Sequence, residues 1–124
     1  AAGSSQTANV TTTKLTFNAS TGTLAATIFN TTSDRNLKEN IATIENALEK
    51  VLSLRGVSFN WRDNKLPAIG IIAQETESVI PEVVTTDYNG MKTVSYDGLI
   101  GLLIEAIKEQ QTQIDHLLNI IKGE

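Results

Sequence analysis

The chain of 124 residues is 40% hydrophobic and 19% charged, so it can form one domain of ordinary size with appendages. Its net charge is −4 and its 10 lysines and arginines are scattered, which argues against the basic face of a nucleic-acid-binding protein. The absence of cysteine and the single histidine, His116, exclude disulfides, thiolate chemistry and a His-rich metal centre, and argue against zinc hydrolysis. We therefore expect neither a metal ion nor a cofactor.

No apolar run approaches the roughly 20 residues that a membrane-spanning helix needs, and the N-terminus lacks the charged and apolar segments of a signal peptide. We therefore expect no membrane among the partners. The negative net charge and the scattered basic residues also lead us to expect no nucleic acid. The chain begins at Ala1 rather than at a methionine, from which we expect that it was cut from a longer polypeptide.

Residues 1–32 are rich in Thr, Ser, Ala and Asn and contain one charged side chain, Lys14. Within them, Leu15–Phe17 and Thr23–Phe29 are expected to form two short strands around a turn at Asn18–Gly22. Two isolated strands bury too little apolar surface to be stable alone. This arm is therefore either a β-structure that pairs with the rest of the chain or with copies of itself, or a disordered linker.

The sequence from Ser33 to about Tyr96 has the pattern of a compact α+β unit. Its first apolar residues recur at three- and four-residue steps, which predicts an amphipathic helix. Asn40 or Thr43 is expected to cap this helix, and Gly56 to end it. The apolar positions of the helix are Ile41, Ile44, Leu48, Val51 and Leu52.

A strand and a second, short helix are expected next. Val57, Phe59 and Trp61 alternate with polar residues, which predicts a half-buried strand whose two aromatic side chains lie in the core. The apolar run Ile69–Ala73 then leads into one or two helical turns over Gln74–Val79.

A hairpin follows the second helix. Pro81 is expected to stop the helix, because proline cannot continue the backbone hydrogen bonding. Glu82–Thr86 and Lys92–Tyr96 then read as two strands across a turn at Asp87–Gly90, whose Asn-Gly pair readily adopts positive φ.

The segment Asp97–Lys122 predicts a helix of about 25 residues that projects roughly 37 Å. Its apolar residues form a heptad pattern, with isoleucine at every a position and the polar Gln110 at one d position. We expect a coiled coil between copies of the chain; the alternative is packing against its own globular unit. Ile104 and Leu118 at e widen the stripe, so the pattern allows two or three chains, and His116 at c is expected to be exposed. The predicted interface residues are Ile100, Leu103, Ile107, Gln110, Ile114, Leu117 and Ile121.

Ser33 and Lys38 lie where the Thr- and Ala-rich segment gives way to ordinary globular sequence. A serine attacks a peptide carbonyl only when a base removes its proton, and a lysine amine can be that base once its pKa is lowered. On one continuous helix, five residues would place the side chains about 140° apart, so the pair requires Ser33 in an extended or turn conformation. The structural alternatives are a helix cap for Ser33 and a solvated surface position for Lys38.

Several blocks of this sequence resemble the C-terminal intramolecular chaperone, auto-processing domain of phage tail spikes, endosialidases, tail fibres and neck appendages. The resemblance covers residues 33 to about 122, and the blocks fall in the same order at similar spacings. They are Ser33–Ile41, Val57–Trp61, Gly70–Glu77, Pro81–Val84, Val94–Asp97 and Leu102–Gln111. The upstream arm, Leu15–Asn30, resembles the repetitive β-stalk that precedes this domain. The implied organisation is the end of a stalk in residues 1–32 and a chaperone domain in residues 33–124, with its coiled-coil helix at 97–122.

The resemblance implies a homotrimer in which the chaperone domain aligns three stalk strands of its own polypeptide and helps them fold. It also implies that each chain then cuts itself once, with Ser33 as nucleophile and Lys38 as general base, and that the domain leaves. The implied cut lies between Ser33 and Asp34. Attack on the Thr32 carbonyl, which would cut before Ser33, is the easier geometry because it passes through a five-membered ring. The protein would then be viral, a precursor of a virion tail protein made in the host cytoplasm.

Two other functions remain as alternatives. The same fold without cutting would be a structural trimerisation tip of a viral fibre. A membrane-tethered transcription-factor precursor that uses the same module is disfavoured by the absence of a basic DNA-binding neighbour. Gln74 and Glu75 either begin their helix as polar caps or lie near the junction at Ser33.

Overall fold

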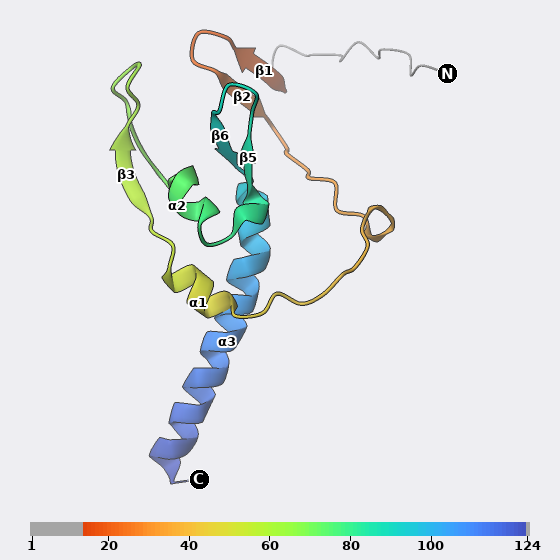
Figure 1. Cartoon of the computed structure of the whole chain (residues 1–124), viewed down its shortest axis with the longest axis vertical. Helices are drawn as coiled ribbons and strands as arrows, with labels where there is room; N and C mark the ends of the chain where they lie inside the picture. The colour runs from red at the N-terminus through yellow and green to blue at the C-terminus, as the bar shows by residue number, and fades with distance from the viewer. Residues whose placement is uncertain (1–13, 124) are drawn as a thin grey trace. The chain divides into compact units, whose positions relative to one another are not determined.

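The computed structural model describes residues 14–123, which divide into two compact units (Figure 1). The first unit ends at Glu39 and the second begins at Asn40. All the α-helices of the described residues belong to the second unit. The predicted α+β class is confirmed at this level, as short strands and helices that end in one long helix.

The described part of the first unit contains one antiparallel hairpin, β1 (Leu15–Asn18) and β2 (Thr23–Ala26). Phe17 lies opposite Leu24 and is 67% exposed, whereas Leu24 is 54% exposed. The two predicted strands are confirmed, although β2 ends before Phe29. The turn between them forms because the side chain of Asn18 accepts hydrogen bonds from Ser20 and because Gly22 adopts a positive φ. The hairpin thus exposes large apolar side chains.

The second unit begins with a connection and a short helix, α1 (Ala47–Leu52), so a helix is present here as predicted but its predicted start was wrong. The helix does not start near Ile41, because Asn40 and Asn46 both adopt positive φ and interrupt helical geometry. Ile44 instead packs against the core as part of a non-helical segment. Ile41, three residues earlier, is 56% exposed, so the spacing of these two isoleucines reflects neither a helix nor a shared buried face.

The N-terminus of α1 is capped from a distance. Asn46 makes no side-chain capping bond, and neither predicted cap does this work. The Glu109 carboxylate, about 60 residues later, accepts the backbone N–H groups of Ala47 and Leu48 at 3.0 and 2.7 Å. A carboxylate at this position satisfies two otherwise unpaired donors and complements the helix dipole. The sequence offers no local signal for it, because the cap comes from the last helix.

Two hairpins and a short helix follow α1. β3 (Val57–Asn60) pairs with β4 (Pro67–Gly70), which leads into α2 (Ala73–Glu77). β5 (Val84–Thr86) then pairs with β6 (Lys92–Val94). The predicted strand, short helix and second hairpin are confirmed. α2 ends at Glu77, and Pro81 opens a 3₁₀ turn, η2 (Pro81–Val83), four residues further on.

Trp61 departs from its predicted place in the core. It is 57% exposed, and its ring meets Phe59 edge to face with centroids 5.1 Å apart. The hairpin that carries both residues has only two strands. The alternating pattern therefore predicted the strand correctly but not the burial of its aromatic end.

The last element is α3 (Tyr96–Lys122), a helix of 27 residues that ends at Gly123, whose φ is +75°. At 1.5 Å per residue it is about 40 Å long. Its inner face completes the core through Leu102 and Ala106, which are 0% and 4% exposed. The remaining core residues are Ala47, Ile80 and Val83. Gly98 allows α3 to approach η2, because an added Cβ would lie 2.7 Å from Val83 Cγ1.

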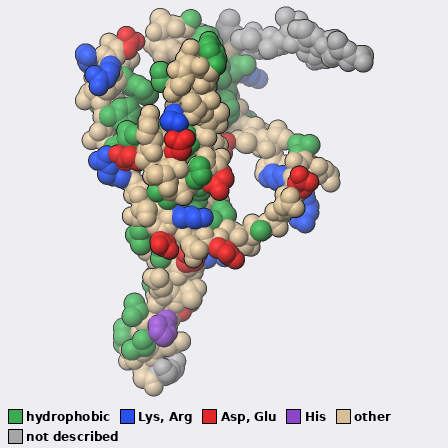
Figure 2. All heavy atoms as spheres, in the orientation of Figure 1, with side chains coloured by type: hydrophobic (Ala, Val, Ile, Leu, Met, Phe, Trp, Pro, Cys, Tyr) green, Lys and Arg blue, Asp and Glu red, His purple; other side chains and the backbone are tan. Residues whose placement is uncertain are grey.

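The other face of α3 carries the heptad residues and does not pack on the chain's own second unit. Ile107 is 65% exposed and Leu117 is 57% exposed. From Gln110 to Gly123 every residue is exposed, and Figure 1 shows this part of the helix extending past α1. Hydrophobic side chains are visible on its surface in Figure 2. His116 is exposed there, as predicted.

Candidate active site

The segment that carries Ser33 and Lys38 folds into a tight local turn. The short 3₁₀ helix η1 (Arg35–Leu37) is capped by Asp34, whose carboxylate accepts the backbone N–H of Asn36 at 2.8 Å. The backbone N–H of Lys38 then bonds the Arg35 carbonyl at 3.0 Å, and the chain leaves the turn in an extended conformation. The cap of this turn is thus Asp34 rather than Ser33. The sequence signal for this cap is an aspartate, because its short side chain can accept the backbone N–H of the residue two positions later.

This turn brings the two candidate catalytic side chains together. Lys38 Nζ donates a hydrogen bond to Ser33 Oγ at 2.6 Å. Ser33 precedes the turn and Lys38 follows it, so the contact avoids the separation that a continuous helix would impose. Both residues are exposed. The distance is within the reach required for proton transfer between a nucleophile and its base.

Three backbone amides of the turn are already hydrogen-bonded within it. The N–H groups of Asn36, Leu37 and Lys38 are directed to Asp34 Oδ1, the Asp34 carbonyl and the Arg35 carbonyl. Peptide cleavage through a tetrahedral intermediate is accelerated by donors aimed at the oxyanion. These three N–H groups already have partners within the turn, so they are not available for that purpose.

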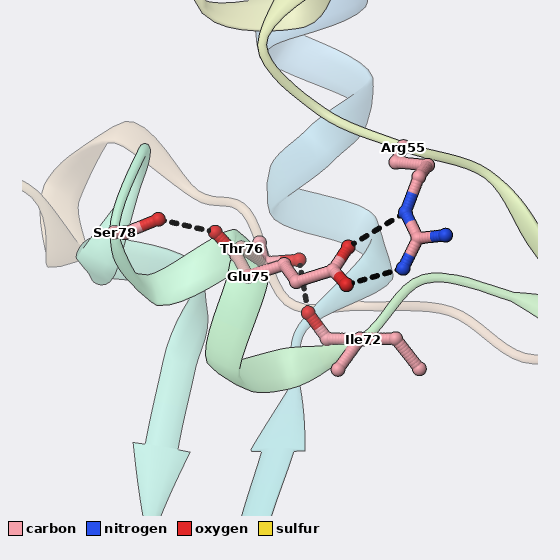
Figure 3. Close-up of polar contacts among 5 residues, drawn as sticks. All are labelled: Arg55, Ile72, Glu75, Thr76 and Ser78. Carbon is pink, nitrogen blue, oxygen red and sulfur yellow. Dashed lines mark hydrogen bonds and ion pairs between the residues drawn. The ribbon is translucent and has the colours of Figure 1, made fainter.

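Glu75, the acidic residue of the Gly-Ile-Ile-Ala-Gln-Glu segment, has a structural partner within the second unit (Figure 3). Its carboxylate forms a bidentate pair with Arg55, in which Arg55 Nε lies 3.2 Å from Oε2. The hydrogen bond from Arg55 lowers the pKa of the Glu75 carboxyl, and the same bond raises the pKa of Arg55. This pair joins the residues after α1 to the first turn of α2.

The hydroxyl groups of the same helix bond to its own backbone, as Figure 3 also shows. Thr76 Oγ1 donates to the Ile72 carbonyl at 2.9 Å, and Ser78 Oγ donates to the Glu75 carbonyl at 2.7 Å. Thr76 is buried at 1% exposure, so its hydroxyl needs this partner. Glu75, Thr76 and Ser78 therefore have structural roles in the second unit.

Across residues 14–123 no three His, Cys, Asp or Glu side chains are grouped so that they could hold a metal ion. Nor does any helix in that range combine the length and hydropathy needed to cross a bilayer.

Comparison with known proteins connects this turn to a family. Residues 33–85 match the family model Peptidase S74, whose description is chaperone of endosialidase. This segment belongs to the chaperone-of-endosialidase family. The match begins at Ser33, so the candidate pair lies at the first residues of the family segment. The resemblance stated from the sequence is thereby confirmed.

The chain is also similar to phage fibre proteins. It is 39% identical over 94 residues to the long tail fibre protein Gp37 of Enterobacteria phage K3, and equally to that of Enterobacteria phage T2. Both matches cover 68% of this chain, whereas a match to Gp37 of Salmonella phage S16 covers 75% at 30% identity. The matched parts are 8%, 7% and 14% of the K3, T2 and S16 proteins. The chain thus spans less than a fifth of these relatives.

Proposed function

We propose that this chain is the trimerising folding chaperone of a phage tail fibre and that it releases itself by cutting its own backbone at Ser33. The observation that carries the proposal is the 2.6 Å hydrogen bond between Lys38 and Ser33, at the start of a segment that matches the chaperone family. The tail fibre relatives support a role in a virion protein.

In the proposed reaction, Lys38 Nζ in its neutral form removes the proton from Ser33 Oγ, which attacks a neighbouring peptide carbonyl. An ester forms as the peptide bond breaks, the departing amine takes the proton, and water then hydrolyses the ester. Each chain carries one such pair in the described turn and cuts only itself. The reaction is therefore a single turnover.

Two bonds are candidates for this cut, and ring size separates them. For Thr32–Ser33, Oγ reaches the Thr32 carbonyl through a five-membered ring. For Ser33–Asp34, the bond that the family resemblance favours, the same Oγ would need a four-membered ring to reach its own carbonyl. That cut is better served by a water molecule that the pair of the same chain activates. The first residue of the released fragment, Ser33 or Asp34, distinguishes the two bonds.

The chaperone part of the proposal rests on the exposed heptad face of α3. Three such helices would gather three stalks and raise the local concentration of their strands. Interlocked β-stalks depend on contacts between distant residues and between chains, and such contacts form slowly. Until they form, the edges of the strands stay exposed. After assembly the chaperone would be removed, and the fibre could then no longer refold from separate chains. Its stability would therefore be kinetic, set by a slow rate of unfolding.

The deciding experiment follows the intact chain and its fragments on denaturing gels and by mass spectrometry. We expect the wild-type chain to lose a fragment of about 90 residues that begins at Ser33 or Asp34. Ser33→Ala and Lys38→Met should stay uncut, with a cleavage rate reduced at least a hundredfold, the usual contribution of general base catalysis. Lys122→Met, which removes an exposed lysine at the far end of α3, is the matched control and should be cut normally.

The alternative function is a non-cleaving trimerisation tip. The observation that favours it is that the heptad face lies on α3, apart in sequence from Ser33 and Lys38. Association through this face would therefore not require either residue. If the wild-type chain and Ser33→Ala remain equally intact, the catalytic proposal fails and the structural tip is the better account. Native mass spectrometry tests the part common to both functions, since each requires three copies.

A further inference from the structure

One polar residue interrupts the exposed apolar stripe of α3. Gln110 occupies a d position, between the apolar layers formed by Ile107 and Ile114. Gln110 is exposed, and so are Ile107 and Ile114 on the same face. A single polar residue in such a seam costs stability in an association but can specify how the helices align.

The positions beside the seam carry no charge that would define an alignment. In coiled coils the e and g positions usually hold charged residues that fix partner and register. Here these six positions hold Ile104, Ala106, Gln111, Gln113, Leu118 and Ile120. The charged residues lie at b, c and f, as Lys108, Glu109 and Glu105 show. The stripe can therefore meet a copy of itself without repulsion between like charges, but it receives no alignment from ion pairs.

The apolar layers do not fix an alignment either. Ile107, Ile114 and Ile121 are identical and seven residues apart, so a slip of one heptad would replace one isoleucine layer by another. Only the d layers differ along the seam. A slip would place Gln110 against Leu103 or Leu117 of the neighbouring helices, where its amide group would find no hydrogen-bonding partner.

The structure shows that the Gln110 amide is not occupied within its own chain. Gln111 Nε2 donates to Asp115 at 2.9 Å, one turn along the same helix. Among the hydrogen bonds of residues 14–123, none involves the side chain of Gln110. Its donors and acceptor are thus open to equivalent groups of other copies.

We propose that Gln110 sets the register of self-association by forming a layer of amides that hydrogen-bond to one another when the helices are level. The partner is a second and a third copy of this chain, and the inference rests on the self-association in the proposed function. Around a three-fold axis the helices are parallel, so the three Gln110 side chains meet at one height. A slipped arrangement buries unpaired amides, which disfavours it by roughly tenfold for each amide.

Cysteine crosslinking measures this register directly, and the chain has no native cysteine to interfere. One chain carries Ile107→Cys and the other Ile114→Cys, both with Ser33→Ala so that they stay whole. They are refolded together and oxidised, and the crosslinks are identified by mass spectrometry. In level helices these two positions are about 10.5 Å apart along the axis, which exceeds the roughly 7 Å span of a disulfide. A crosslink between positions 107 and 114 therefore reports a slip.

We expect that crosslink to be rare with Gln110 and to rise about tenfold, relative to the crosslinks between like positions, in Gln110→Leu. Gln110→Asn keeps an amide and should remain level. Gln113→Leu, the same change at an exposed g position, is the matched control and should not slip. If Gln110→Leu still associates without the slipped crosslink, the register has another origin and the inference is wrong. If all variants remain single chains by native mass, self-association itself fails, and the inference fails with it.

Discussion

The two units of this protein are stabilised in opposite ways. The described part of the first unit, residues 14–39, holds its hairpin and its turn by bonds between residues close in sequence, and Phe17 and Leu24 are more than half exposed. The second unit buries Ala47 and Leu102 completely, although the two lie 55 positions apart in the chain. The candidate catalytic pair belongs to the unit with local contacts, and the core belongs to the other.

This difference separates what each unit needs in order to form. The Ser33–Lys38 contact requires only the turn that Asp34 caps, so it can form without a hydrophobic core. The β1–β2 hairpin exposes Phe17 and Leu24, and an isolated two-stranded hairpin is only marginally stable in water. The described part of the first unit therefore positions the candidate pair by local contacts and has no buried residue of its own. The second unit has its own core.

The largest expected effect contrasts one leucine from each unit. Leu102→Ala should lower the free energy of unfolding of the second unit by about 2–5 kcal/mol, because it opens a cavity at a position that is 0% exposed. Leu24→Ala, at 54% exposure, should change it by less than about 0.5 kcal/mol. Unfolding is followed by the circular dichroism signal of α-helix. Within residues 14–123 this signal comes from the second unit, because the α-helices lie there. Equal losses for the two variants would contradict the contrast.

A smaller effect is expected at the long-range cap. Glu109→Ala removes both acceptors from the N-terminus of α1 and should lower the free energy of unfolding by about 1–2 kcal/mol. Hydrogen exchange at the amides of Ala47 and Leu48 should accelerate, while the rest of α3 stays protected. Glu105→Ala, which breaks only a pair with Lys108 on the same helix, is the control and should leave those two amides unaffected. Unchanged exchange in Glu109→Ala would mean that α1 is held by packing alone.

The smallest effect concerns the exposed pair between Arg55 and Glu75. The pKa of Glu75 is lowered in the folded state, so the pair contributes to stability above the ordinary value near 4.5. The contribution is lost as the pH falls through the lowered pKa of the folded state. Glu75→Gln should therefore melt below the wild type at pH 7, and the gap should close in acid and shrink in high salt. Glu82→Gln, an exposed change in η2, should show no such closing gap.

Patterns within a few residues predicted much of this protein correctly. The alternation around Phe59, the Asn-Gly turn before Met91 and the heptads of α3 each gave the element that the structure contains. The requirement that Ser33 stand outside a helix was also met, because the turn at Asp34 is encoded by adjacent residues. In each case the interaction that decides the local structure is itself local.

The wrong predictions share the opposite property. The spacing of Ile41 and Ile44 indicated helix, yet Ile44 is apolar because it faces the core formed with α3. Trp61 was placed in the core from its alternation, yet the β3–β4 sheet has only two strands. A periodic pattern thus predicts neither the local structure nor the burial of a side chain when the surface that would cover it lies elsewhere in the chain.

By itself the sequence determined most of the strands and helices in their order, the candidate pair Ser33 and Lys38, and the heptad stripe along the last helix. Only the tertiary structure decided where α1 begins, that Glu109 caps it, and which face of α3 is left open. Those outcomes depend on residues that are far apart in the chain and meet only in the folded state. Their free energies come from contacts that no short stretch of sequence contains.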